Sequence, residues 1–176
     1  MPTNVEIKAK APDLNNLRRL VSEISSSPAV EMDQDDTFFS VSSGRLKLRI
    51  SSVSQAQLIY YHRHDSPLPK KSYYIVSEVH DPSSMRALLT ESLGIIGRVR
   101  KHRTLYKIKN TRVHLDEIEG LGTYIELEVV LARGGLVEEG RLVALDLMSR
   151  LGIDVASLVS GAYLDLIRSS RQGGET

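Results

Sequence analysis

Alternating charged and apolar residues near the start of the chain suggest metal and phosphate chemistry. Single apolar residues separate Glu6, Lys8 and Lys10. Because a β-strand sends successive side chains to opposite faces, these three charged groups share one face of the expected strand Asn4–Lys10. If that face points into a barrel, its carboxylate and its two ammonium groups can hold a metal ion and a polyanion side by side.

A second alternating segment carries only cations. Arg45, Lys47 and Arg49 are separated by leucines, which places three positive charges on one strand face at intervals of roughly 7 Å. Parallel cations repel one another unless an anion lies between them. Similar alternation occurs on other segments, at Arg63, Lys101 and Arg103. A solvated sheet face is the alternative interpretation, but recurrence on several strands favours an anion-binding surface.

Glu126 and Glu128 form a third alternating pattern, now of carboxylates backed by aliphatic residues. Mg²⁺ and Mn²⁺ prefer oxygen ligands, and a divalent cation relieves the repulsion between two carboxylates. A solvent-facing acidic strand explains this short pattern about as well when it is considered alone.

The formal net charge of +1 conceals strong segregation of charge along the chain. Residues 98–112 contain seven Lys or Arg residues and no acid, whereas residues 116–128 contain five acids and no Lys or Arg. This layout suits a phosphate ligand with its metal ion. The acidic segment opposes an open nucleic-acid groove, so we expect no nucleic-acid partner.

Composition limits the fold and the chemistry further. With 176 residues, of which 41% are hydrophobic, the chain is expected to form one domain over residues 1–168, followed by a disordered tail over residues 169–176. The absence of cysteine excludes disulfides, thiolate catalysis and cysteine-ligated zinc. No apolar run is long enough to span a bilayer or to act as a signal peptide, so we expect a cytoplasmic protein without a membrane partner.

Periodicity predicts eight strands with helices between and after them. The expected strands are Asn4–Lys10, Thr37–Val41, Arg45–Ser51, Gln57–His64, Ser72–Val76, Arg98–Ile108, Arg112–Glu117 and Thr123–Leu131. The expected helices follow Asp13 and Asp81, cover Val137–Arg150, and resume over Ala156–Ile167. Closely spaced hairpins with inserted and appended helices indicate an α+β fold built on an antiparallel barrel.

The ordered set of motifs resembles the CYTH family, named for class IV adenylyl cyclase and thiamine triphosphatase. The similarity spans nearly the whole chain. The matching motifs are Asn4-x-Glu6-x-Lys8, Gln34-x-Asp36-x-Phe38-Phe39, Arg45-x-Lys47-x-Arg49, Leu115-Asp116-Glu117 with Gly120-Leu121-Gly122, Glu126-x-Glu128, and Gly161-Ala162-Tyr163-Leu164-Asp165-Leu166.

The resemblance implies the triphosphate tunnel metalloenzyme fold, an eight-stranded antiparallel barrel whose lumen holds a triphosphate and one or two divalent cations. By motif match, the residues that would contact phosphate are Lys8, Lys10, Arg45, Lys47, Arg49, Arg63, Lys101 and Arg103. The residues that would hold Mg²⁺ or Mn²⁺ are Glu6, Asp116, Glu126 and Glu128. No side chain is assigned as the catalytic group.

Two positions depart from the family pattern. Asn4 stands where the family usually has a glutamate, and it offers a neutral carbonyl in place of a carboxylate. Phe38 stands where the family has a tyrosine, so no hydroxyl can assist water activation there. We therefore expect a second metal to bind weakly, while the number of metals and the effect of Phe38 on turnover stay open.

The leading functional hypothesis is a metal-dependent phosphohydrolase that acts on inorganic triphosphate, thiamine triphosphate or a nucleoside triphosphate. A class IV-type adenylyl cyclase that forms cyclic AMP from ATP is one alternative, and a non-catalytic polyphosphate-binding module is another. The partner is a small-molecule triphosphate in each case. The sequence leaves the preferred triphosphate and the oligomeric state open.

Overall fold

Eight antiparallel strands form the body of the molecule. The computed structural model describes residues 3–53, 55–63 and 67–172, without the side chains of Thr3, Arg63, Lys70 and Gln172. In this part of the chain, the strands close into a barrel in the order β1-β5-β4-β3-β2-β6-β7-β8, which confirms the predicted fold class. The strands are β1 (Thr3–Lys10), β2 (Val30–Phe39), β3 (Arg45–Ser51), β4 (Ala56–Arg63), β5 (Lys70–Val79), β6 (Ile95–Ile108), β7 (Thr111–Ile118) and β8 (Gly122–Val130).

The first strand closes the barrel. β1 pairs with β5 on one side and with β8 on the other, and both pairings are antiparallel. Along the seam with β8, Glu6 lies opposite Glu128 and Lys8 lies opposite Glu126. The side chains of cross-strand partners lie on the same face. This register therefore brings Glu6 and Lys8 together in the lumen with two acids that lie far away in the sequence.

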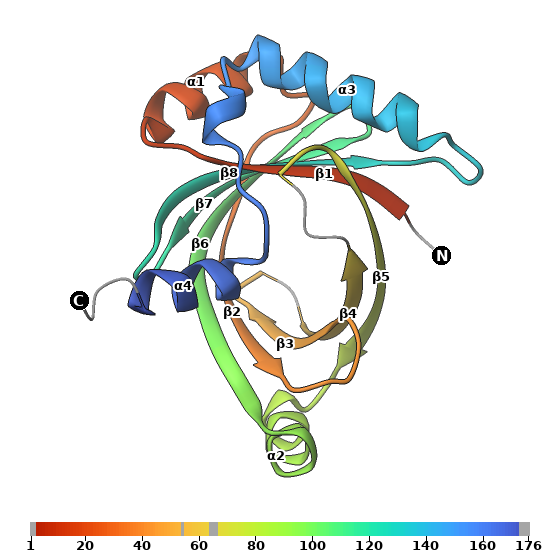
Figure 1. Ribbon diagram of the computed structural model, residues 1–176, viewed down its shortest axis with the longest axis vertical. Helices are drawn as coiled ribbons and strands as arrows, with labels where there is room; N and C mark the ends of the chain where they lie inside the picture. The colour runs from red at the N-terminus through yellow and green to blue at the C-terminus, as the bar shows by residue number, and fades with distance from the viewer. Residues whose placement is uncertain (1–2, 54, 64–66, 173–176) are drawn as a thin grey trace.

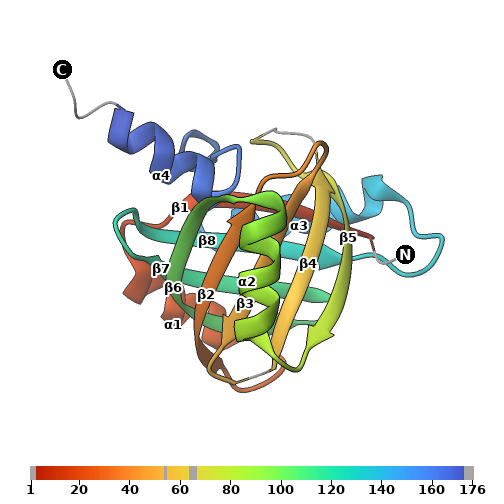
Figure 2. The same cartoon turned by 90° about the horizontal axis from the view of Figure 1, so that it is seen from below.

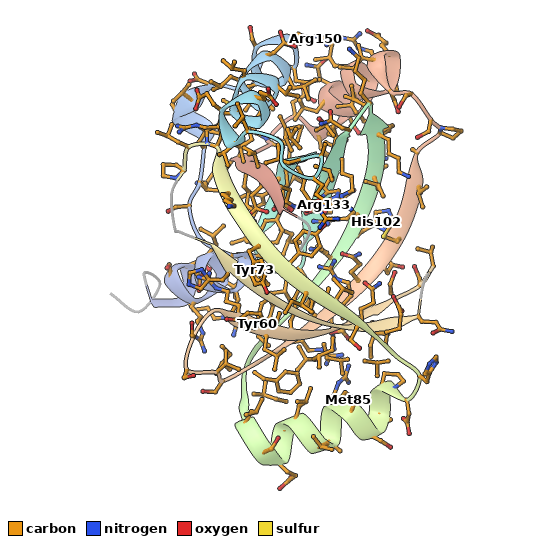
Figure 3. All side chains as sticks on the ribbon, turned by 90° about the vertical axis from the view of Figure 1, so that its right-hand side faces the viewer. Tyr60, Tyr73, Met85, His102, Arg133 and Arg150 are labelled. Carbon is orange, nitrogen blue, oxygen red and sulfur yellow. The ribbon has the colours of Figure 1, made fainter. Side chains whose placement is uncertain are left out.

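Helices cover the apolar outer faces of the strands. The longer helices are α1 (Leu14–Ile24), α2 (Pro82–Leu93), α3 (Val137–Arg150) and α4 (Tyr163–Gln172). Figure 1 shows α1 and α3 together over one side of the barrel, where both pack on a core of residues from β1, β6, β7 and β8. Figure 2 shows α2 across the outside of β2 and β3. Met85 of α2, labelled in Figure 3, packs against a second apolar core, which includes Phe39 of β2 and Leu48 of β3.

No helix within the described residues is both long and apolar enough to cross a bilayer.

The C-terminal segment runs from α3 to one mouth of the barrel. A short 3-10 helix, η1 (Val155–Ser157), follows α3, and the backbone N–H of Val159 then donates to the carbonyl of Lys8 at 2.9 Å. α4 begins beyond Gly161, whose φ of +82° is in the left-handed region that favours glycine. Figure 1 shows α4 beside β6 and β7. The segment therefore ties the end of the chain to the first strand.

β2 begins seven residues earlier than the predicted strand Thr37–Val41 and runs over Val30–Phe39. The missed part contains several acids, which have low strand propensity. Two of these acids pair with cations outside the barrel: Glu31 with Arg18, at 3.2 Å, and Asp35 with Arg98. These ion pairs offset the low intrinsic strand propensity of the acidic residues.

The end of the chain also differs from the prediction. Residues 156–167 do not form one helix, because η1 and α4 are separated by the turn at Gly161. α4 instead extends through Ser169–Gln172, which lie in the predicted tail. Residues 173–176 of that tail, and His64 at the end of a predicted strand, lie outside the described residues.

Replacement of Gly140 by valine should loosen the contact between α3 and β1. A Cβ at this position would lie 2.8 Å from Val5 Cγ2 and 2.8 Å from Leu131 Cδ2, closer than packed side chains tolerate. We expect Gly140→Val to lower the free energy of unfolding by about 1–3 kcal/mol in urea denaturation. The control Leu142→Val, at a position 61% exposed on the same helix, should change it by less than about 0.5 kcal/mol. Equal stability of the two variants would contradict this packing.

Candidate functional site

The barrel encloses a cavity of about 460 Å³. Side chains from all eight strands line it, together with Ala162 and Tyr163 from the C-terminal segment. On each strand the lining residues are two positions apart, as in Asn4, Glu6 and Lys8 of β1, because alternate side chains point inward. The two-residue alternation seen in the sequence therefore marks the side chains that face the lumen.

Asp36 forms ion pairs with two of the predicted phosphate-binding cations on one side of the cavity. Arg49 donates to both of its carboxylate oxygens at 2.7 Å, and Lys47 Nζ donates to Oδ2 at 2.8 Å. Burial by itself raises the pKa of Asp36, but the charges of Arg49 and Lys47 outweigh it and hold this pKa well below its usual range. The carboxylate stays ionised and fixes both cations.

Lys47 itself is held near its titration point. Burial and the adjacent charge of Arg49 lower its pKa to about 8, although the charge of Asp36 acts in the opposite direction. Its Nζ lies 5.5 Å from the centroid of the Phe38 ring and 5.6 Å from that of Tyr61. A bound anion near this ammonium group would favour its charged form.

Asp116 is buried behind the cavity lining and binds a third cation, Arg103. Arg103 donates to both of its oxygens at 2.6 Å, and the Tyr163 hydroxyl donates to Oδ2 at 2.7 Å. Burial raises the pKa of Asp116, but the charges of Arg103 and Lys101 outweigh that effect and lower it far below the usual range. Asp116 therefore acts as a buried counter-ion that orients Arg103 toward the lumen.

Tyr163 also contacts two lysines through its ring. Lys8 Nζ lies 4.0 Å from the ring centroid and Lys101 Nζ lies 5.1 Å from it, distances at which a cation is attracted to an aromatic face. Lys8 further donates to the carbonyl of Gly161 at 3.3 Å. Burial and the charge of Arg103 hold the pKa of Lys101 well below its usual value. The C-terminal segment thus positions ammonium groups that belong to distant strands.

The acidic side of the cavity comprises Glu6, Glu126 and Glu128. Glu126 lies 3.9 Å from Lys8 Nζ and 3.2 Å from Arg103 Nη2. Burial raises the pKa of Glu126, but the charge of Lys8 and a hydrogen bond from His114 hold it well below its usual range. Arg112 Nε donates to Glu128 at 2.7 Å. Glu126 is therefore ionised, and Glu126 and Glu128 both lie beside protein cations.

Asn4 and His114 complete this side. The amide nitrogen of Asn4 donates to Glu128, while its buried carbonyl oxygen has no hydrogen-bond partner among the described residues. His114 Nδ1 lies 3.4 Å from Glu126 Oε2, and burial together with the charge of Arg103 lowers its pKa. Its imidazole is therefore neutral near pH 7.

Most of the residues chosen from the sequence meet in the cavity. The lining includes Glu6, Lys8, Lys47, Arg49, Lys101, Arg103, Glu126 and Glu128. Asp116 lies beneath the lining, and Lys10 is exposed outside it. Arg45 lies outside the lining and is 2.6 Å from Asp165 of α4. The side chain of Arg63, at the end of β4, is outside the described part of the structure.

Three further groups were not selected as site residues from the sequence. Asp36 was recognised only as part of a motif, although it holds Lys47 and Arg49. Arg112 shares the alternation of His114 and Asp116 on β7, so this pattern alone could have identified it. Tyr163 reaches the cavity from a helix, and no strand periodicity could have indicated it.

Within residues 3–53, 55–63 and 67–172, no group of three or more histidine or acidic side chains converges in the manner of a metal site. The oxygen donors of Glu6, Glu126, Glu128 and Asn4 instead line one side of a shared cavity.

Known proteins share this sequence pattern and fold. A Methanocaldococcus jannaschii protein, provisionally named an adenylate cyclase, is 23% identical over 170 residues, covering 92% of this chain and 97% of that protein. A Pyrococcus horikoshii structure aligns with a TM-score of 0.83 at 23% identity, over 93% of this chain and 99% of that one. A Hippeastrum protein, provisionally assigned as an adenylyl cyclase and described with a dominant triphosphatase activity, aligns with a TM-score of 0.68 at 18% identity, over 97% and 96% of the two chains.

The family model of the CYTH domain matches residues 2–163, which include every strand of the barrel and the start of α4. This chain therefore belongs to the CYTH family.

Proposed function

We propose that this protein is a Mg²⁺- or Mn²⁺-dependent hydrolase that releases orthophosphate from a triphosphate compound bound in the barrel cavity. The observation that carries the proposal is the convergence of six cations from four strands on one cavity that also contains four carboxylates. The cations are Lys8, Lys47, Arg49, Lys101, Arg103 and Arg112.

Catalysis of phosphoryl transfer depends mainly on positioning and on stabilisation of charge spread over the phosphoryl oxygens. Lysine and arginine side chains on opposite walls can contact several phosphate groups at once. Arg49 and Arg103 are already oriented by Asp36 and Asp116, so little reorganisation is needed when a substrate enters. The water nucleophile then attacks the terminal phosphorus, and the remaining diphosphate leaves.

The oxygen donors on the acidic side are of the type that a hard divalent cation prefers, although the described residues do not converge on one point as a metal site does. Glu6, Glu126 and Glu128 provide carboxylate oxygens, and the unpartnered carbonyl oxygen of Asn4 is a neutral oxygen donor. We assign these four residues to metal binding, and we assign Asp116 to the orientation of Arg103. A bound Mg²⁺ or Mn²⁺ would neutralise charge on the phosphoryl oxygens and polarise the phosphorus.

An adenylyl cyclase is the second candidate, because the name of the Methanocaldococcus relative points to that activity. The ribose 3′-hydroxyl of ATP would then replace water as the nucleophile, and pyrophosphate would leave. The description of the Hippeastrum relative supports hydrolysis as the dominant reaction. Chromatography of an ATP incubation distinguishes cyclic AMP and pyrophosphate from ADP and orthophosphate.

Glu128→Gln should lower orthophosphate release from inorganic triphosphate by about 100-fold or more, because loss of the metal removes several kcal/mol of charge stabilisation. The measurement is phosphate release with Mg²⁺ and with Mn²⁺, and circular dichroism checks the fold. Glu117→Gln is the control, since Glu117 lies on the outer face of β7 with a side chain 53% exposed. A Glu128→Gln variant with wild-type activity would contradict the metal assignment. Tight binding without turnover by the wild-type protein would favour a polyphosphate-binding module.

Binding of inorganic triphosphate should weaken as the pH rises above about 8. In the free protein, Lys47 loses its proton near this pH, whereas the bound polyanion requires the charged form. When a group must take up a proton on binding, the affinity falls about tenfold for each pH unit above the pKa of that group in the free protein. On binding inorganic triphosphate at pH 9, the Lys47→Arg variant should take up about one proton fewer than wild type, because arginine is already charged. Calorimetry without metal, repeated in buffers of different ionisation enthalpy, measures this proton uptake. Equal uptake by the two proteins would refute this role of Lys47.

Replacement of Tyr163 should separate the contributions of its hydroxyl and its ring. Tyr163→Phe keeps the ring beside Lys8 and Lys101 but removes the hydrogen bond to Asp116, whereas Tyr163→Leu removes both. We expect the KM for inorganic triphosphate to be about tenfold higher for Tyr163→Leu than for Tyr163→Phe, with a smaller difference in kcat. Identical KM values would show that the ring does not position the lysines.

A further inference from the structure

Both carboxylate oxygens of Glu128 already accept hydrogen bonds from the protein. Arg112 Nε donates to Oε2 at 2.7 Å, and the amide nitrogen of Asn4 donates to Oε1. Glu128 also lies opposite Glu6 in the register of β8 and β1, so the two acids share one face of the sheet. A divalent cation bound to Glu128 would therefore lie next to the guanidinium charge of Arg112, and two positive charges this close repel each other.

The ion pair of Arg112 with Glu128 accounts for the arrangement of the acids in the cavity. Within the described part of the chain, the acids do not converge on one point as they do in a metal site. Glu128 is instead directed toward Arg112 and Asn4, which hold one of its oxygens each. The free protein thus has the oxygen donors of a metal site without their convergence.

Arg112 is held less firmly than the other cations of the cavity. Its side chain is 36% exposed, whereas the other described cations of the lining are at most 14% exposed. Arg103 is fixed by two bonds to the buried Asp116. Arg112 pairs with one carboxylate among the described residues, that of Glu128, and its hydrogen bond with Tyr74 joins it to a neutral group. Arg112 is therefore the cation that can most easily change partners.

A bound phosphate chain offers Arg112 a stronger partner than Glu128. A guanidinium group can form two parallel hydrogen bonds with phosphate oxygens, and these charge-assisted bonds are stronger than neutral ones. Transfer of Arg112 to phosphate would leave Glu128 beside the neutral side chains of Asn4 and His114. The carboxylate would then attract a divalent cation without a competing positive charge from Arg112.

We propose that Arg112 blocks metal binding at Glu128 in the free protein and releases this carboxylate when a phosphate chain enters the cavity. This inference rests on the proposed function, which supplies the triphosphate and the metal, and it adds the order in which the two bind. The anion binds first and the divalent cation binds tightly only afterwards. Because the coupling between two ligands is reciprocal, the cation in turn strengthens the binding of the anion by the same factor.

The first test measures Mn²⁺ binding without any phosphate compound, by electron paramagnetic resonance of the unbound ion. We expect Arg112→Met to bind Mn²⁺ about tenfold more tightly than wild type, because both the competing ion pair and the adjacent positive charge are lost. The matched control is Arg49→Met, which removes the same charge from the same cavity but from a residue that pairs with Asp36. Its Mn²⁺ affinity should stay within about threefold of wild type, since the lost charge does not contact Glu128. Circular dichroism checks that both variants are folded.

The second test is the crystal structure of the wild-type protein with inorganic triphosphate and EDTA. Without metal the compound stays intact, and the position of Arg112 can be observed directly. We expect its guanidinium group to contact phosphate oxygens and to have left Glu128. A complex in which the pair of Arg112 with Glu128 persists would overturn the proposal.

The Mn²⁺ measurements separate the remaining outcomes. If Arg112→Met binds Mn²⁺ no more tightly than wild type, Arg112 does not block the site. If Arg49→Met tightens binding as much as Arg112→Met, the effect comes from the total charge of the cavity, and the proposal is overturned as well. Neither test depends on turnover. Absence of triphosphate hydrolysis by wild type would therefore refute the proposed function, while the role of Arg112 would still be decided by these two measurements.

Discussion

The mutual repulsion of cations buried around one cavity is the constraint on which the rest of this structure depends. Two like charges 4 Å apart repel by about 4 kcal/mol at an effective dielectric constant of about 20. That energy is comparable to a large part of the total stability of a domain, about 5–15 kcal/mol. Asp36 and Asp116 offset the repulsion by pairing with Lys47, Arg49 and Arg103. The two aspartates therefore make an unliganded cationic lumen compatible with folding, and they also compete with an incoming polyanion for the same cations.

Much of the apolar packing lies on the outside of the barrel, away from that network, although Phe38 and Val99 line the cavity and pack in one cluster with Tyr163. α1, α2 and α3 cover the outward faces of the strands. The C-terminal segment is different, because it contacts the charged residues directly: Tyr163 donates to Asp116, and Asp165 pairs with Arg45. The state of the cavity and the docking of α4 are therefore physically linked, and a change in one should be felt by the other.

The sequence predicted the barrel because several strands, Arg45–Ser51 above all, alternate charged and apolar residues, and the lumen side of those strands followed from that alternation. Alternation identifies the face of a side chain but not its depth or its partner. For this reason Lys10 and Arg45, chosen with the lumen cations, lie outside the cavity lining, whereas Asp116 lies beneath it. β2 was only partly predicted, because its acids are stabilised by cations from distant segments. The role of Tyr163 depends on tertiary docking, which no local pattern encodes.

Closure of the barrel by its first strand has a consequence for synthesis and folding. Asn4 and its partner Glu128 are 124 residues apart in the sequence, so the seam between β1 and β8 cannot form until most of the chain has left the ribosome. Contacts between such distant residues are formed slowly, because a long loop must be closed first. Until then β1 has an unpaired edge able to recruit another nascent chain. The strand that carries Glu6 and Lys8 is therefore both the first to be made and among the last to be protected.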